Sequence, residues 1–196
     1  MPRVGLTEAI VVEEAERMVD EVGPAGLTLT ALAERLGVRQ PSLYKHVDGL
    51  DALHRSISVR AKRDLGERFA RAAVGRSRGD AIVGMAQVFR RWALAHPGRY
   101  VAAQKAPAAH DADDIAASNA IVQVCADVLA GYGLEGDDAI DAIRALRSAL
   151  HGFVSLEMTG GFGLPADIDR SFDRLVTSLT DAMAAWSTST QGSDQR

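Results

Sequence analysis

The sequence predicts an all-α fold, and three observations lead to this. Apolar residues recur every three or four positions along most of the 196 residues, as on a helix with one buried face. Glycine and proline interrupt these stretches at short intervals. No segment alternates apolar and polar residues in the way that a half-buried strand does. We therefore expect about nine helices, with a three-helix N-terminal domain followed by a larger C-terminal helical bundle.

Two threonines mark the beginnings of the first two helices. Thr7 precedes a helix that Gly23-Pro24 ends, and Thr28 caps a short helix that Gly37 ends. The apolar positions of both helices have the spacing of one buried face: Val12, Ala15, Val19 and Val22 in the first, and Leu29, Leu32, Ala33 and Leu36 in the second.

A third short helix and a longer fourth one follow. The third covers residues 40–46, where Pro41 is tolerated because it falls in the first turn. The fourth begins near Leu50 and carries a single apolar stripe as far as Phe69. Two short helices joined by a glycine-containing turn have the spacing of a helix-turn-helix, whose second helix is short enough to enter a DNA major groove.

From about residue 75 the expected helices are longer and their apolar faces are larger. His96-Pro97-Gly98 ends one of them, and Gly160-Gly161 ends another. The last two long helices, at about 137–158 and 167–186, are the most apolar. We expect them to pair with their two-fold mates in a homodimer, as a four-helix bundle. Residues 187–196 contain no apolar side chain, which predicts a flexible tail.

Composition and charge exclude several classes of protein. Hydrophobic residues at 47% and charged residues at 24% are typical of a globular chain and exclude disorder throughout. A single cysteine, Cys125, excludes a disulfide framework and a multi-cysteine zinc site. The sequence shows no secretion signal and no apolar run of about 20 residues, so we expect a cytoplasmic protein without a membrane partner.

Positive charge gathers around the helix-turn-helix. Residues 35–63 contain seven lysines and arginines against two aspartates, in a chain whose net charge is −4. Such a local basic surface can attract phosphate without making the whole chain basic. Polar side chains with little to bury follow the turn: Arg39, Gln40, Ser42, Tyr44, Lys45 and His46.

Residues 6–63 resemble the DNA-binding domain of the tetracycline-repressor (TetR) family of bacterial transcription regulators. The resemblance is carried by Thr28, Leu32-Ala33, Leu36-Gly37-Val38 and, above all, Gln40-Pro41-Ser42-Leu43-Tyr44 with His46-Val47 before a helix. Residues 148–157, with the glycine-rich run 160–163, resemble a His-Gly-containing type of C-terminal domain in that family.

The resemblance implies a homodimer that reads a palindromic operator with one recognition helix per subunit. Gln40 would pair with a base edge, and Pro41 would contact a thymine methyl group. Tyr44 would lie near a phosphate or a base, and phosphate contacts from neighbouring side chains would set the register. The expected DNA-binding residues are Thr28, Arg39, Gln40, Pro41, Ser42, Tyr44, Lys45 and His46.

Two positions depart from the family pattern. Leu50 stands where many members carry a lysine that donates to phosphate, and Thr30 stands where an arginine is common. Both changes predict weaker anchoring to the DNA backbone at these points.

The apolar side chains of residues 85–158 are either plain core or the lining of a ligand cavity. Helical bundles hold small molecules in such cavities, where a few polar groups orient the ligand. The expected ligand-binding residues are Met85, Phe89, Trp92, Tyr100, Gln104, Cys125, His151 and Met158.

The same sequence argues against catalysis and against a bound metal or cofactor. His151 and Glu157 are six residues apart, so they do not share a helix face as partners at three or four positions do. The sequence has no strand-turn-helix nucleophile elbow. His110, with the aspartates at 111, 113 and 114, is more typical of a solvated loop and helix N-terminus than of a metal site. We expect neither an enzyme nor a cofactor.

The sequence therefore predicts residues 1–50 as the helix-turn-helix domain, 51–74 as a connecting helix, 75–186 as the ligand-binding and dimerisation domain, and 187–196 as the tail. The expected function is a ligand-responsive transcriptional repressor, released from its operator by a small, mostly apolar effector. The alternative is an all-α small-molecule-binding module without specific operator binding.

Overall fold

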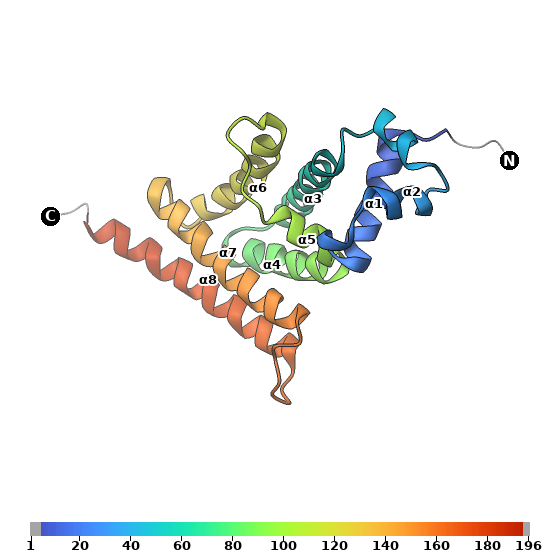
Figure 1. The fold of residues 1–196 in the computed structure, drawn as a ribbon. Coiled ribbons are helices and arrows are strands. Elements are labelled where there is room, and N and C mark those ends of the chain that lie inside the picture. The colour runs from blue at the N-terminus through green and yellow to red at the C-terminus, as the bar shows by residue number, and fades with distance from the viewer. Residues whose placement is uncertain (1–4, 194–196) are drawn as a thin grey trace. The chain divides into compact units, whose positions relative to one another are not determined.

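The computed structural model describes residues 5–193, and it describes side chains as far as residue 186. This part of the chain forms eight α-helices and two 3₁₀ helices and contains no strand, so the all-α prediction is confirmed (Figure 1). The elements are α1 (Glu8–Val22), η1 (Pro24–Gly26), α2 (Leu29–Arg35), η2 (Gln40–Lys45), α3 (Leu50–Ala73), α4 (Arg78–Ala95), α5 (Pro97–Ala103), α6 (Ala112–Ala130), α7 (Gly136–Met158) and α8 (Ile168–Ser193).

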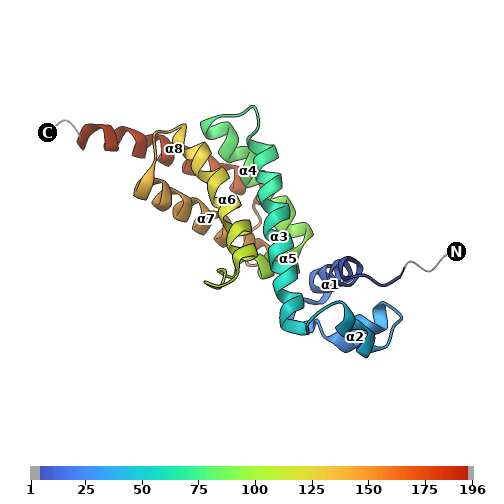
Figure 2. The same cartoon turned by 90° about the horizontal axis from the view of Figure 1, so that it is seen from above.

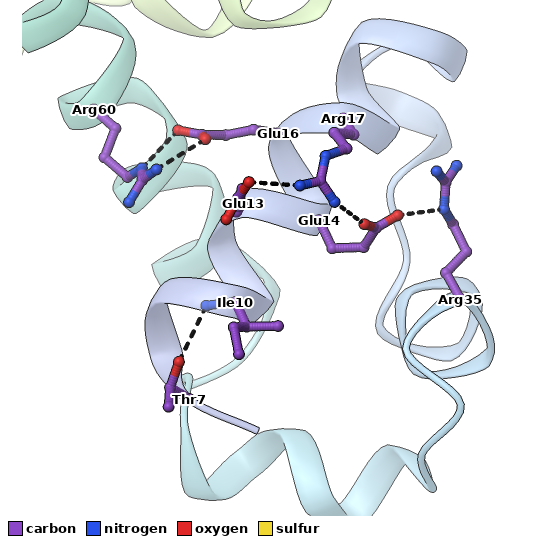
Figure 3. Close-up of polar contacts among 8 residues, drawn as sticks. All are labelled: Thr7, Ile10, Glu13, Glu14, Glu16, Arg17, Arg35 and Arg60. Atoms are coloured by element: carbon purple, nitrogen blue, oxygen red, sulfur yellow. Dashed lines mark hydrogen bonds and ion pairs between the residues drawn. The ribbon is translucent and has the colours of Figure 1, made fainter. Parts of the chain in front are cut away.

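Capping side chains and a glycine set the ends of the N-terminal helices. The Thr7 hydroxyl accepts a hydrogen bond from the Ile10 amide at 3.3 Å (Figure 3). The Thr28 hydroxyl accepts one from the Ala31 amide at 3.1 Å. Gly37 follows α2 with φ +65°, a backbone conformation that glycine adopts without strain. Both capping predictions are therefore confirmed.

Packing divides the chain differently from the predicted boundary at residue 75. One compact unit runs to Asp64 and also includes Ala95–Ser118, and the other comprises Leu65–Leu94 and the residues from Asn119 onward. α5 belongs to the first unit because it packs against α1. The sequence gives no local sign of this packing.

Contact between α1 and α5 is close because Gly98 has no side chain. A β-carbon built on Gly98 would lie 1.8 Å from the Val19 carbonyl oxygen. Beside it, Asp20 accepts hydrogen bonds from the Arg99 amide at 2.9 Å and from Arg99 Nε at 2.7 Å. The glycine and the ion pair together hold the short helix α5 on α1.

The start of α6 is held on α3 by a second set of ion pairs within the same unit. Lys62 is 4% exposed at its side chain; its Nζ donates to Asp114 at 2.6 Å and to the Lys105 carbonyl at 2.9 Å. Arg55 donates to both carboxylate oxygens of Asp111, each at 2.5 Å. This Arg55 contact lowers the pKa of Asp111 to about 2.

The apolar clusters of the second unit include one around Ile82, Leu129 and Met183 and one around Phe153 and Phe172. α7 and α8 lie side by side, as Figure 1 shows. The backbone of α8 stays helical to Ser193, within the segment predicted to be a tail, because lengthening an existing helix adds one backbone hydrogen bond per residue. The rest of that segment, residues 194–196, lies outside the described residues.

Replacing Lys62 with methionine should lower the free energy of unfolding by about 3–5 kcal/mol, because Asp114 would stay buried without a partner. Urea unfolding measures this loss. The matched control is Arg63→Met, one residue along, whose pair with Asp113 is more than half exposed on both sides; it should change stability by no more than ~1 kcal/mol. Equal losses in both variants would show that the buried pair has no special role.

Candidate nucleic-acid interface and effector region

The predicted recognition segment is a 3₁₀ helix, η2, and this geometry sorts its side chains. In a 3₁₀ helix, side chains three residues apart lie on the same face. Leu43 is 0% exposed in the core of α1, α2 and the start of α3, and Gln40 shares its face and is half-buried. Pro41 and Tyr44 share another face, and both are exposed. Figure 2 shows the short segment beside α1 and α2, at the beginning of α3.

The eight predicted DNA-binding residues therefore occupy one short stretch and the cap of α2. Tyr44 is 55% exposed, which is high for a large aromatic side chain. The predicted residues that are exposed are Thr28, Arg39, Pro41, Tyr44 and Lys45, and those that are half-buried are Gln40, Ser42 and His46. These side chains combine hydrogen-bonding, cationic and apolar groups within one turn and its flanks.

Thr30 contributes to this surface through its hydroxyl group. In the sequence, Thr30 stands out only as a residue that replaces a common arginine, which does not predict this contribution. The Thr30 hydroxyl donates to Gln40 Oε1 at 3.1 Å, from the first turn of α2 to the first residue of η2. This hydrogen bond restrains the amide expected to reach a base edge. Nothing in the sequence indicates the pair, since the two residues are ten positions apart on different helices.

The positive charge counted in residues 35–63 is mostly neutralised by carboxylates on other elements. Arg35 pairs with Glu14 at 2.7 Å and also with Glu21, and Arg60 donates to Glu16 at 2.7 Å (Figure 3). Arg55, Lys62 and Arg63 pair with the aspartates at the start of α6. The predicted basic surface was therefore too broad.

Two cations of this region keep their charge available. Arg39 and Lys45 are exposed, and neither forms an ion pair within the part of the chain that the structure describes. Both flank η2, at its N-cap and at its last residue. The sites open to phosphate are thus concentrated beside the exposed face of Pro41 and Tyr44.

The predicted effector residues fall in both compact units. Met85, Phe89 and Trp92 are buried on α4, whereas Cys125 on α6 and Met158 at the end of α7 are half-buried. His151 on α7 packs against Phe89, with ring centroids 4.8 Å apart. Tyr100, buried on α5, and Gln104, the exposed residue that ends it, belong to the N-terminal unit.

Two titratable groups of the second unit are uncharged at neutral pH. Burial, together with the Arg147 charge, lowers the pKa of His151 to about 4. Burial raises the pKa of the Cys125 thiol to about 11. The contact between Phe89 and His151 therefore presents an aromatic, largely apolar surface.

Glu157 is committed to another partner. Arg90 donates to both of its carboxylate oxygens, at 2.7 and 2.6 Å, and to Asp169 at 2.7 Å, with its guanidinium over the Phe172 ring. Glu157 thus serves to hold α4 to α7. No group of three or more histidine, cysteine or acidic side chains suited to a metal occurs among the described residues. No described helix is long and apolar enough to cross a membrane.

Comparison with known proteins identifies the family. A family model described as "Tetracyclin repressor-like, C-terminal domain" matches residues 82–179. The chain is 41% identical over 180 residues to the uncharacterized HTH-type transcriptional regulator Rv0681 of Mycobacterium tuberculosis, covering 91% of this chain and 82% of the relative. The chain belongs to the TetR family. The finer resemblance of its C-terminal domain to a His-Gly-containing type stays a prediction.

Further relatives agree with this TetR-family assignment. The HTH-type transcriptional regulator YobS of Bacillus subtilis is 34% identical, over 85% of this chain and 87% of its own length. The putative regulatory protein SCO4313 superimposes with a TM-score of 0.72 at 26% identity, over 88% of this chain and 94% of that one. The Q116A variant of TetR from Acinetobacter baumannii, solved in complex with minocycline, shares the fold with a TM-score of 0.70 at 23% identity, over 93% of this chain and 99% of that one. This TetR-family chain is a helix-turn-helix transcriptional regulator.

The half-buried His151 makes stability depend on pH. The folded pKa of His151, about 4, lies below its ordinary value of 6.5, so the unfolded chain binds this proton first as the pH falls. Stability is therefore lost from about pH 6.5 down to pH 4, by ~2–3 kcal/mol relative to a variant without the group.

Urea unfolding of the wild type and of His151→Leu between pH 7 and pH 4 tests this loss. His110→Gln, which replaces an exposed histidine, should keep the wild-type dependence. A wild-type profile that runs parallel to that of His151→Leu over the whole window would contradict the expectation.

Removing the Thr30 hydroxyl should weaken operator binding through Gln40. In Thr30→Val the amide loses its hydrogen bond, and we expect affinity to fall by roughly 3–10-fold, the value of about one hydrogen bond. The same substitution in a Gln40→Ala background should have little further effect. Fluorescence anisotropy with labelled operator measures all four proteins. Additive losses would mean that Thr30 acts without Gln40.

Proposed function

We propose that this TetR-family regulator binds a palindromic operator as a homodimer and represses transcription until a small, mostly apolar effector releases it. One observation carries the DNA-binding part: Leu43 is fully buried while Pro41, Tyr44 and Lys45 on the same turn are exposed. The core thus holds η2 by one side and presents its other side outward. Such an arrangement suits a major groove, where base edges and flanking phosphates are read together.

Within this surface the roles divide by chemistry. The Gln40 amide can pair with an adenine edge, and Pro41 can contact a thymine methyl group. Arg39 and Lys45 have no carboxylate partner among the described residues and are suited to phosphates. Thr28 is an exposed hydroxyl at the N-terminus of α2, where phosphate is favoured.

Exposed apolar side chains on α7 and α8 support dimerisation through these helices. Ile140 is 45% exposed, Leu156 50% and Trp186 38%. These groups lie on the two helices that the sequence predicts to pair with their mates, and such pairing would remove apolar surface from water. Pairing both helices with their mates would give a dimer with two copies of η2 for one DNA duplex. Half-sites on such a duplex lie one helical turn, about 34–36 Å, or a multiple of it apart.

The proposed effector acts by shifting the population of dimer conformations. Buried aromatic and sulfur-containing residues of the second unit, with an uncharged His151, support an apolar ligand. To move the protein from 99:1 to 1:99 in favour of the released state, the effector must prefer that state by about 5.5 kcal/mol. A broad screen of metabolites and drugs in which no compound changes operator affinity would overturn this part of the proposal.

The same observations support regulation rather than catalysis. Glu157, the candidate partner for His151 in a catalytic pair, is held by Arg90 instead. The proposed role requires the chain to work on genomic DNA, in the cytoplasm of a bacterium.

Base-contact and phosphate-contact variants should weaken DNA binding in different ways. Gln40→Ala should lower affinity for the operator by about tenfold or more while leaving non-specific binding unchanged. Lys45→Ala should weaken binding to all sequences alike and reduce the slope of log affinity against log salt by about 1.

The measurement is fluorescence anisotropy against fragments flanking the chain's own gene and against an unrelated fragment, at two salt concentrations. Lys105→Ala, an exposed lysine outside the helix-turn-helix, is the matched control and should bind as wild type does. If every fragment in a genome-wide set bound alike and binding vanished with salt, the chain would be a ligand-binding module without an operator.

A further inference from the structure

A groove of about 730 Å³ lies within the second unit, between the last turns of α3 and α4, and its lining reaches along α4 as far as Arg91. Its lining residues include four arginines, Arg68, Arg71, Arg76 and Arg91, against one carboxylate, Asp80. None of the predicted effector residues lines it. The groove is therefore distinct from the apolar region where the sequence predicts a ligand.

Positive charge is concentrated in this part of the chain beyond what the composition predicts. Residues 65–94 contain six arginines and only two acidic residues, in a chain with a net charge of −4. Elsewhere the arginines are mostly satisfied: Arg35, Arg55 and Arg60 pair with carboxylates at 2.5–2.7 Å. Ion pairing thus accounts for Arg35, Arg55 and Arg60, whereas it does not account for every arginine of the groove.

Three of the groove arginines offer their charge to a ligand. Arg76 and Arg91 form no ion pair among the described residues. Arg71 approaches Glu67 at 3.5 Å, but both side chains are about two-thirds exposed, so this pair contributes little. The proposal does not depend on Arg68, which has its own interactions.

Arg76 is held in place at the groove by a hydrogen bond to the backbone. Its Nη1 donates to the Ala72 carbonyl at 3.0 Å. It lies against Gly84 on α4, where a β-carbon would stand 2.2 Å from that nitrogen. Arg76 can occupy this position only because residue 84 has no side chain. The guanidinium is therefore pre-organised, which reduces the entropy lost when it binds an anion.

We propose that this groove binds a small organic polyanion, with phosphate or carboxylate groups on the arginines and an organic body against Val83 and Val88. Guanidinium groups bind both kinds of anion through paired hydrogen bonds. The volume is that of a small-molecule site. Four arginines are too few for a strong contact with a nucleic-acid backbone, which takes many neutralised phosphates. This site is independent of operator binding.

Isothermal titration calorimetry on the full chain tests the proposal, with inorganic tripolyphosphate and citrate as separate probes at about 150 mM salt, where non-specific attraction between exposed charges is screened. We expect one probe to bind once per chain with a dissociation constant below about 1 mM. Preference for tripolyphosphate would indicate a phosphate ester as the natural ligand, and preference for citrate a polycarboxylate.

The variant Arg76→Gln/Arg91→Gln should weaken this binding by about tenfold or more, since two charge-assisted contacts are lost. Gly84→Ala should weaken it too while keeping every charge, because the added carbon displaces Arg76. The matched control, Arg144→Gln on α7, replaces an arginine that is 75% exposed and should change affinity by less than about twofold. Thermal melts confirm that each variant is folded.

Three results would overturn the proposal. The first is binding of neither probe below about 1 mM. The second is equal weakening by the groove variants and by Arg144→Gln, which would show attraction to general positive charge. The third is binding of a short DNA duplex or an acidic peptide, but of neither probe, in a manner that requires Arg76 and Arg91, because the groove would then contact a macromolecule.

Discussion

Complete burial of Leu43 is the constraint on which the DNA-binding surface depends. One leucine in a six-residue 3₁₀ helix enters the core of α1, α2 and α3, and the short helix has no other fully buried residue. Because η2 is too short to be stable alone, this contact supplies both its position and its rotation. Every exposed side chain of the recognition surface takes its direction from that one anchor.

Electrostatics in the first unit serve mainly to join helices. Acidic residues of α1 pair with Arg35 from α2, Arg60 from α3 and Arg99 from α5, so one helix links three others through its carboxylates. These pairs explain why a chain with a net negative charge can still present cations to DNA: the acidic residues are occupied internally. The positive charge available near η2 then comes from the cationic side chains that form no ion pair among the described residues.

The sequence predicts elements whose cause is local and misses contacts whose partners are distant. Thr7 and Thr28 cap helices through the amide three residues later, so both positions follow from the chain itself. The packing of α5 on α1 brings Gly98 next to Val19, although the two residues are far apart in the sequence. Only the complete fold places them together. The broad basic surface was wrong for the same reason, since the count over residues 35–63 could not include carboxylates 14 to 58 positions away.

The hydrogen bond between Thr30 and Gln40 bears on how operator preference can change. Gln40 Oε1 already accepts one hydrogen bond, so the amide approaches DNA with its NH₂ group as the more available side. A new side chain at position 40 leaves the threonine hydroxyl without its acceptor, and a new one at position 30 lets the amide rotate. If Gln40 contacts a base as proposed, the base preference at this point depends on residues of two helices. A change of operator at this point would then favour joint changes at positions 30 and 40, which would slow the drift of the original preference.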